Sequence, residues 1–137
     1  MTEITESGTM RVLAAIKAGH PPFDAGDAAI KFWTMALRLG GVTNIEDAIE
    51  AVVRHYSTPG ANPWIIPGDV VGHYRELRRE RVKDINDGDL TPDLDPFAPV
   101  SVYLGTYKAR YAAVEDGMPK AVAIATVAPV KMIEAAK

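Results

Sequence analysis

The side chains of this chain that could act as acid, base or nucleophile are few and scattered. Only three histidines occur. His20 stands directly before two prolines, whereas His55 and His73 fall in segments with helical periodicity. A hydrolytic triad needs a serine or threonine beside a histidine and a carboxylate, and no serine here has the sequence of a nucleophile elbow. We therefore predict no catalytic residues.

Sites for nucleotides and metals are equally poorly supported. The sequence contains neither a G-x-x-x-x-G-K-[ST] loop nor a G-x-G-x-x-G turn, so the chain is not a self-contained P-loop ATPase. On one helix face, His73 with Asp69 and Glu76 is the set whose spacing suits a metal. A surface histidine among charged neighbours is the simpler interpretation. We predict no cofactor, no metal and no enzyme activity.

A dense basic segment is the strongest charge feature. Arg75, Arg79 and Lys83 are four residues apart and form one stripe on a helix. Such a stripe can track nucleic-acid phosphates or dock an acidic protein surface. A solvated helix face is the third interpretation, because Glu76 and Glu80 dilute the positive field. Five aspartates come directly after the basic segment: Asp84, Asp87, Asp89, Asp93 and Asp95.

Aromatic residues offer a second kind of contact. Three tyrosines recur at steps of four residues, a spacing that suits core packing, presentation of a helix to a partner, or stacking on bases. Trp33 is expected in the core, whereas Trp64, on a proline-rich loop, is the better interface anchor. The candidate partner-binding residues are Trp64, Arg75, Arg78, Arg79, Arg81, Lys83, Tyr103, Leu104, Tyr107 and Tyr111.

The bulk composition is that of an ordinary globular protein. Of 137 residues, 47% are hydrophobic and 24% are charged. Without cysteine there is no disulfide framework, which suits a reducing compartment. The start of the chain lacks a signal peptide, and the longest uncharged apolar stretch, 121–130, falls short of the about 20 residues of a membrane-spanning helix. We therefore expect a soluble cytoplasmic protein with no membrane contact.

Four segments have apolar residues at the three- and four-residue spacing of amphipathic helices, at about 5–18, 25–39, 45–56 and 67–84. Gly40 and Gly41 end the second, and Pro67 suits the first turn of the fourth. N-terminal caps for the first three are expected from Thr5 or Ser7, Asp24 or Asp27, and Thr43 or Asn44.

The remainder of the chain reads differently. Residues 84–99 are acidic and proline-rich, which indicates a linker. A fifth amphipathic helix follows, with an apolar side made of Val100, Tyr103, Leu104, Tyr107, Tyr111 and Val114. The sequence thus predicts an all-α protein: an orthogonal bundle of about four helices in residues 1–83, a linker at 84–99, and a C-terminal helical segment at 100–137.

The order of these elements carries a resemblance. Residues 20–23, His-Pro-Pro-Phe, form a short aromatic-proline turn, and the next helix carries Trp33 and Leu37. The third helix starts with Asp-Ala-Ile at 47–49 and ends near His-Tyr at 55–56, before a proline-containing loop. Over residues 10–82 this pattern resembles the small helicase-loader proteins of bacteriophages of Gram-positive bacteria.

The resemblance implies a compact helical domain that binds the hexameric replicative helicase and hands it to an origin-bound initiator without hydrolysing ATP. On this interpretation Tyr103, Leu104, Tyr107 and Tyr111 supply an apolar anchor, and the arginines between Arg75 and Arg81 contact the helicase, the initiator or DNA. One alternative is a DNA-binding regulator that uses the fourth helix for recognition. Another is a host-takeover protein that blocks a host factor, and a small enzyme is the least supported.

Overall fold

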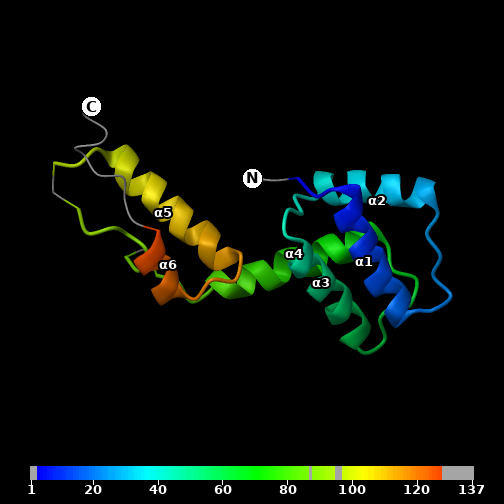
Figure 1. The fold of residues 1–137 in the computed structure, drawn as a ribbon. Coiled ribbons are helices and arrows are strands. Elements are labelled where there is room, and N and C mark those ends of the chain that lie inside the picture. The colour runs from blue at the N-terminus through cyan, green and yellow to red at the C-terminus, as the bar shows by residue number, and fades with distance from the viewer. Residues whose placement is uncertain (1–2, 87, 95–96, 128–137) are drawn as a thin grey trace. The chain divides into compact units, whose positions relative to one another are not determined.

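The computed structural model describes residues 3–86, 88–94 and 97–127, and Figure 1 shows its helices. This part of the chain is all-α, as predicted, and contains no strand. None of its helices combines the length and apolarity needed to cross a bilayer. The helices are α1 (Glu6–Gly19), α2 (Asp27–Leu39), α3 (Ile45–Ser57), α4 (Pro67–Val82), α5 (Val100–Glu115) and α6 (Lys120–Thr126).

The chain divides into two compact units, each with its own hydrophobic cluster. The division falls inside α4, between Leu77 and Arg78. The sequence had suggested a boundary after residue 83. Local periodicity continues through α4, so it does not mark where the first cluster ends.

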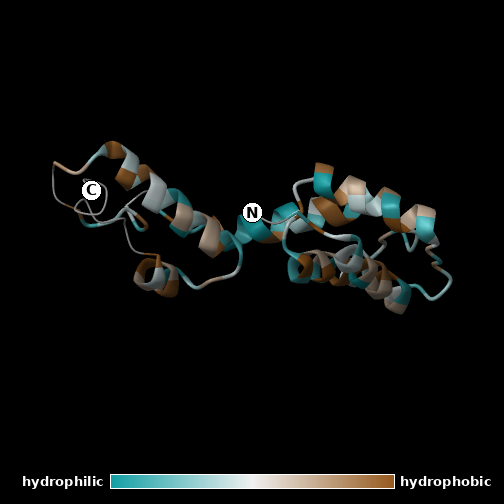
Figure 2. Cartoon of the chain, turned by 45° about the horizontal axis from the view of Figure 1, so that its top comes forward, coloured by the Kyte–Doolittle hydropathy of each residue, from teal (hydrophilic) through white to brown (hydrophobic). Residues whose placement is uncertain are grey.

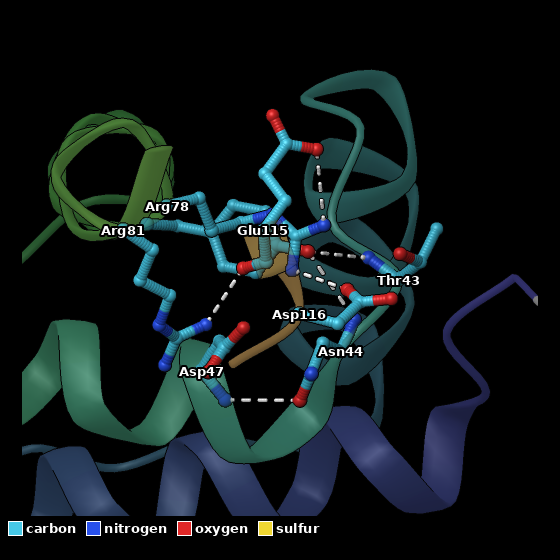
Figure 3. A network of polar contacts seen from close by, with 8 residues as sticks. Thr43, Asn44, Asp47, Arg78, Arg81, Glu115 and Asp116 are labelled. Carbon is cyan, nitrogen blue, oxygen red and sulfur yellow. Dashed lines mark hydrogen bonds and ion pairs between the residues drawn. The ribbon is translucent and has the colours of Figure 1, made fainter. Parts of the chain in front are cut away.

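The helix starts of the first unit follow from local capping. The side chain of Thr5 accepts the N–H of Gly8 at 3.1 Å. Asn44 Oδ1 accepts the N–H of Asp47 at 3.1 Å (Figure 3). The expectation for α2 was wrong: its N-cap is Gly26, which has no side chain to accept a bond, and neither neighbouring aspartate takes that place. Glycine is still an acceptable N-cap because its backbone adopts the required extended conformation.

The core of the first unit is centred on α1, which packs against both α2 and α3. Trp33 is 6% exposed, as expected of a core residue, and Phe23 meets it edge-on. A polar bridge deep in this core joins two threonines: Thr34 Oγ1 donates to Thr9 Oγ1 at 2.7 Å. The fully buried apolar side chains of this core include Val12, Ile16, Leu37, Ala48, Ala51 and Val70.

The first turns of α4 are attached to the loop that precedes α3. The hydroxyl oxygen of the buried Tyr74 accepts the backbone N–H groups of Thr43 at 3.2 Å and Asn44 at 3.3 Å. Beside it, Val71 packs directly on Gly40, where an added Cβ would lie 2.5 Å from Val71 Cγ2. Glycine at this position therefore sets the close approach of α4 to the end of α2.

The second unit is organised around a buried cation. Arg110 is 6% exposed and donates to three backbone carbonyl oxygens, those of Val127 at 2.8 Å, Leu90 at 3.1 Å and Ile124 at 3.2 Å. Leu90 itself is fully buried, with Val114 and Ala123. The stretch interpreted as a linker thus contributes a core residue, since the carbonyl of Leu90 is held by α5.

The buried side of α5 also differs from the expected one. Thr106, Arg110 and Val114, four residues apart, are the buried positions of this helix. By contrast, Val100 is 70% exposed and Leu104 is 52% exposed. The tyrosines lie at the margins of the buried side, so apolarity alone did not indicate which side of α5 faces the core.

Candidate protein-binding site

The loop between α3 and α4 exposes two large apolar side chains. Trp64 is 56% exposed and Ile66 is 61% exposed, whereas Ile65 between them is 4% exposed and belongs to the first core. The buried isoleucine fixes the backbone, and its two neighbours therefore point outward. We call Trp64, Ile66 and His20, which contacts Trp64, the Trp64 surface.

Two side chains at the end of α3 hydrogen-bond to the backbone of this loop. The buried His55 ring donates from Nε2 to the carbonyl oxygen of Asn62 at 2.6 Å. Because a carbonyl can only accept, this contact assigns the proton to Nε2. Tyr56 donates its hydroxyl to the carbonyl oxygen of Pro63 at 3.0 Å. Burial, with the nearby Asp69 carboxylate, raises the pKa of Tyr56, so its hydroxyl stays protonated as a donor.

Two more bonds fix the backbone on either side of Trp64. The N–H of Trp64 itself donates to Asn62 Oδ1 at 3.0 Å. The N–H of Ile66 donates to Asp69 Oδ2 at 3.0 Å, and the N–H of Asp69 returns a bond to the carbonyl oxygen of Ile66 at 3.0 Å. This reciprocal pair resembles a capping box and starts α4. The loop therefore presents Trp64 in a fixed position.

The C-terminal end of α1 supports the indole. His20, the C-cap of α1, meets the Trp64 ring edge-on with the ring centroids 4.5 Å apart. Its Nε2 atom is buried and has no hydrogen-bond partner within the described residues. Just before it, Gly19 lies against the Tyr56 ring, where an added Cβ would be 2.6 Å from Cδ2. This glycine lets α1 approach α3 beside the loop.

The histidine with metal-compatible spacing, His73, lies near the His55 ring. His73 meets His55 edge-on at 5.6 Å and lines an open cavity of about 410 Å³ with Arg54, Ser57, Thr58 and Glu76. Asp69 is engaged by the backbone at Ile66. In the described ranges, no three histidine or carboxylate side chains converge as metal ligands would.

The basic residues of α4, together with Lys83 just after its last residue Val82, fall into two groups. Within the second unit, Arg78 pairs with Asp116 at 2.6 Å and with Glu115 at 3.5 Å, and Arg81 donates to the carbonyl oxygen of Glu115 at 2.9 Å (Figure 3). Their charges thus hold the end of α5. The three residues of the predicted stripe are exposed instead: Arg75, Arg79 and Lys83. Of these, Arg75 donates to the carbonyl oxygen of Gly40 at 3.0 Å.

The predicted aromatic anchor on α5 is largely structural. Tyr103 is half-buried and donates its hydroxyl to the carbonyl oxygen of Leu94 at 3.2 Å. The rings of Tyr107 and Tyr111 stack with centroids 6.2 Å apart and pack against the second cluster. Leu104 is the member of this set that is exposed.

Comparisons with protein-family models, with curated proteins and with solved structures give no match. The interpretation of the Trp64 surface therefore depends on its own geometry. Sequence reasoning identified Trp64 but missed Ile66 and His20. Their signal was weak: Trp64, Ile65 and Ile66 stand between Pro63 and Pro67, and nothing local shows which of the two isoleucines points outward.

Proposed function

We propose that this protein acts by binding another protein, and that the Trp64 surface is its main contact. The observation that carries the proposal is the exposed indole on a loop whose backbone is hydrogen-bonded on both sides. Tryptophan is over-represented among residues that dominate binding energy. A preorganised side chain also loses little conformational entropy on association, which favours affinity.

For the partner, we propose the replicative hexameric helicase, with a role in loading or modulating it. The support is the resemblance of residues 10–82 to phage helicase loaders. The exposed cations Arg75, Arg79 and Lys83 offer a second contact for an acidic surface of the helicase or of an initiator. The role proposed here is stoichiometric binding without catalysis.

The test is a binding measurement between the full chain and a purified hexameric helicase from a Gram-positive host. Trp64→Ala should weaken binding by about thirtyfold or more, as truncation of a hot-spot residue does. Val53→Ala is the matched control, because Val53 on α3 is 57% exposed and lies outside the Trp64 surface. Absence of binding by the wild type would reject the helicase, and equal affinity of both variants would reject the site.

A second candidate is direct DNA binding, favoured by the exposed stripe of Arg75, Arg79 and Lys83. Phosphate contacts release counterions, so the affinity for duplex DNA should then fall steeply as salt is raised. Each Arg→Gln substitution in the stripe should lower that slope by about one. Salt-independent or undetectable DNA binding would reject this second candidate.

A further inference from the structure

Helix α2 is apolar on two opposite sides. Its inner side contributes Trp33 and Leu37 to the first core. On the other side, Phe32 is 64% exposed, Met35 is 64% exposed and Leu39 is 82% exposed. Figure 2 shows hydrophobic residues recurring along the length of this helix. Contiguous exposed apolar side chains of this kind mark interaction surfaces.

The outward residues form one continuous stripe. Ala28, Phe32, Met35 and Leu39 are separated by four, three and four residues, which is the spacing of a coiled-coil seam. We call these four residues the α2 outer stripe. One flank of the stripe carries small residues, Ala29 and Ala36, which permit a neighbouring helix to approach closely. The other flank carries the charged residues Asp27, Lys31 and Arg38.

We infer that the α2 outer stripe is a self-association surface, on which α2 of a second copy packs antiparallel about a two-fold axis. A two-fold interface brings the same patch of both copies together and must be self-complementary. With the axis between Phe32 and Met35, Leu39 of one copy faces Ala28 of the other, a large residue over a small one. Phe32 faces Met35, and thioether–aromatic contacts of this kind are favourable.

The charged flank also fits a second copy. Arg38 Nε lies 3.7 Å from Glu3 Oε2 and donates to the carbonyl oxygen of Ile4 at 2.8 Å, so Glu3 belongs to the same flank. In the antiparallel register, Arg38 of the second copy falls between Asp27 and Lys31, and its Glu3 comes near Lys31. Each copy contributes two cations and two anions to this flank. Parallel pairing would instead place the charges against alanines.

The stripe covers only three turns of helix. The area that it can bury is therefore smaller than the about 800 Å² per partner of a standard interface. The dimer should therefore be weak, with a dissociation constant in the micromolar range. The inference does not depend on which partner binds the Trp64 surface.

Sedimentation of the full chain over a range of concentrations tests the association. The wild type should pass from monomer to dimer, and Leu39→Glu should raise the dissociation constant at least about tenfold. Val53→Glu, on α3, is the matched control and should dimerise like the wild type. Circular dichroism melting checks that both variants fold. A wild type that stays monomeric throughout would overturn the inference, as would an unchanged constant for Leu39→Glu.

Cross-linking tests the register, because the chain has no cysteine of its own. Ala28→Cys mixed with Leu39→Cys should cross-link between copies through a short bis-maleimide, and Phe32→Cys should link to Met35→Cys in the same way. Ala28→Cys alone should link poorly to itself, since its two copies lie at opposite ends of the interface. Efficient self-linking of Ala28→Cys would overturn the antiparallel arrangement.

Discussion

The imidazole of His20 lies edge-on to the indole of Trp64, with 4.5 Å between ring centroids, and so joins the end of α1 to the loop that exposes Trp64. In this geometry the hydrogen-bearing edge of one ring meets the electron-rich face of the other. The buried Nε2 of His20 has no hydrogen-bond partner among the described residues. The contact therefore depends on the aromatic ring itself and not on a hydrogen bond from Nε2.

This contact predicts different stabilities for two substitutions at His20. His20→Ala removes the ring and should lower the free energy of unfolding by about 1 kcal/mol. His20→Phe keeps an aromatic ring and removes a buried polar atom without a partner, so it should be at least as stable as the wild type. Urea unfolding followed by tryptophan fluorescence measures both. A His20→Phe variant less stable than His20→Ala would show that the imidazole nitrogen has a polar role.

Arg110 provides the second prediction. Arg110→Leu would leave the carbonyl oxygens of Leu90, Ile124 and Val127 without their donor, and should destabilise the second unit by about 3 kcal/mol or more. Hydrogen exchange should show lost protection in α5 and α6. The amides of α1 and α3 serve as the internal control, because they belong to the other cluster. Unchanged protection in α5 would contradict the structural role of Arg110.

Two glycines should respond oppositely to alanine. At Gly40 an added Cβ would lie 2.5 Å from Val71 Cγ2, so Gly40→Ala should destabilise the chain by about 1–3 kcal/mol. Gly72 is inside α4, and an added Cβ there would point into open space beside the helix, so Gly72→Ala should stabilise by about 0.5–1 kcal/mol. Thermal unfolding of the two variants checks the signs. A stable Gly40→Ala would mean that α4 shifts without cost.

Acid should loosen the start of α6. The backbone N–H of Asn86, and then the Lys120 ammonium, hold the pKa of Asp89 below its ordinary value of 3.8. A lowered pKa in the folded state means that the contribution to stability is present above about pH 3.8 and is lost as the pH falls through the folded value. Amide chemical shifts near Lys120 should follow this titration.

The control for this titration is Asp89→Asn, which keeps the size of the side chain and removes its charge. In this variant the amides near Lys120 should show no such pH dependence. The same titration in both proteins would assign the effect to another carboxyl group.

Local signals explain why the first unit was predictable. Thr5 and Asn44 each belong to a pair of candidate caps that the sequence offers, and the apolar spacing of α3 has one interpretation. The second unit was harder, because nothing in the acidic, proline-rich segment 84–99 distinguishes Leu90 from its other apolar residues, such as Ile85 and Leu94. The burial of Leu90 depends on Arg110, twenty residues further along the chain, and no local pattern reports such a contact.

The candidate site divides in the same way. Trp64 could be predicted because prolines force a loop and a large ring there must have a role. The support from His20 could not, since it requires α1 and the loop to meet in three dimensions. Arg78 and Arg81 looked like partner contacts because their acceptors, at Glu115 and Asp116, are remote in sequence.

The bonds of Arg110 all end on main-chain oxygens, and this has a consequence for how the sequence can vary. Any amino acid at the three acceptor positions supplies a carbonyl, so these bonds do not restrict what evolution places there. The three hydrogen bonds therefore constrain the identity of one residue, Arg110. Homologues should keep this arginine even where the acceptor residues differ, which makes it a marker for aligning distant relatives.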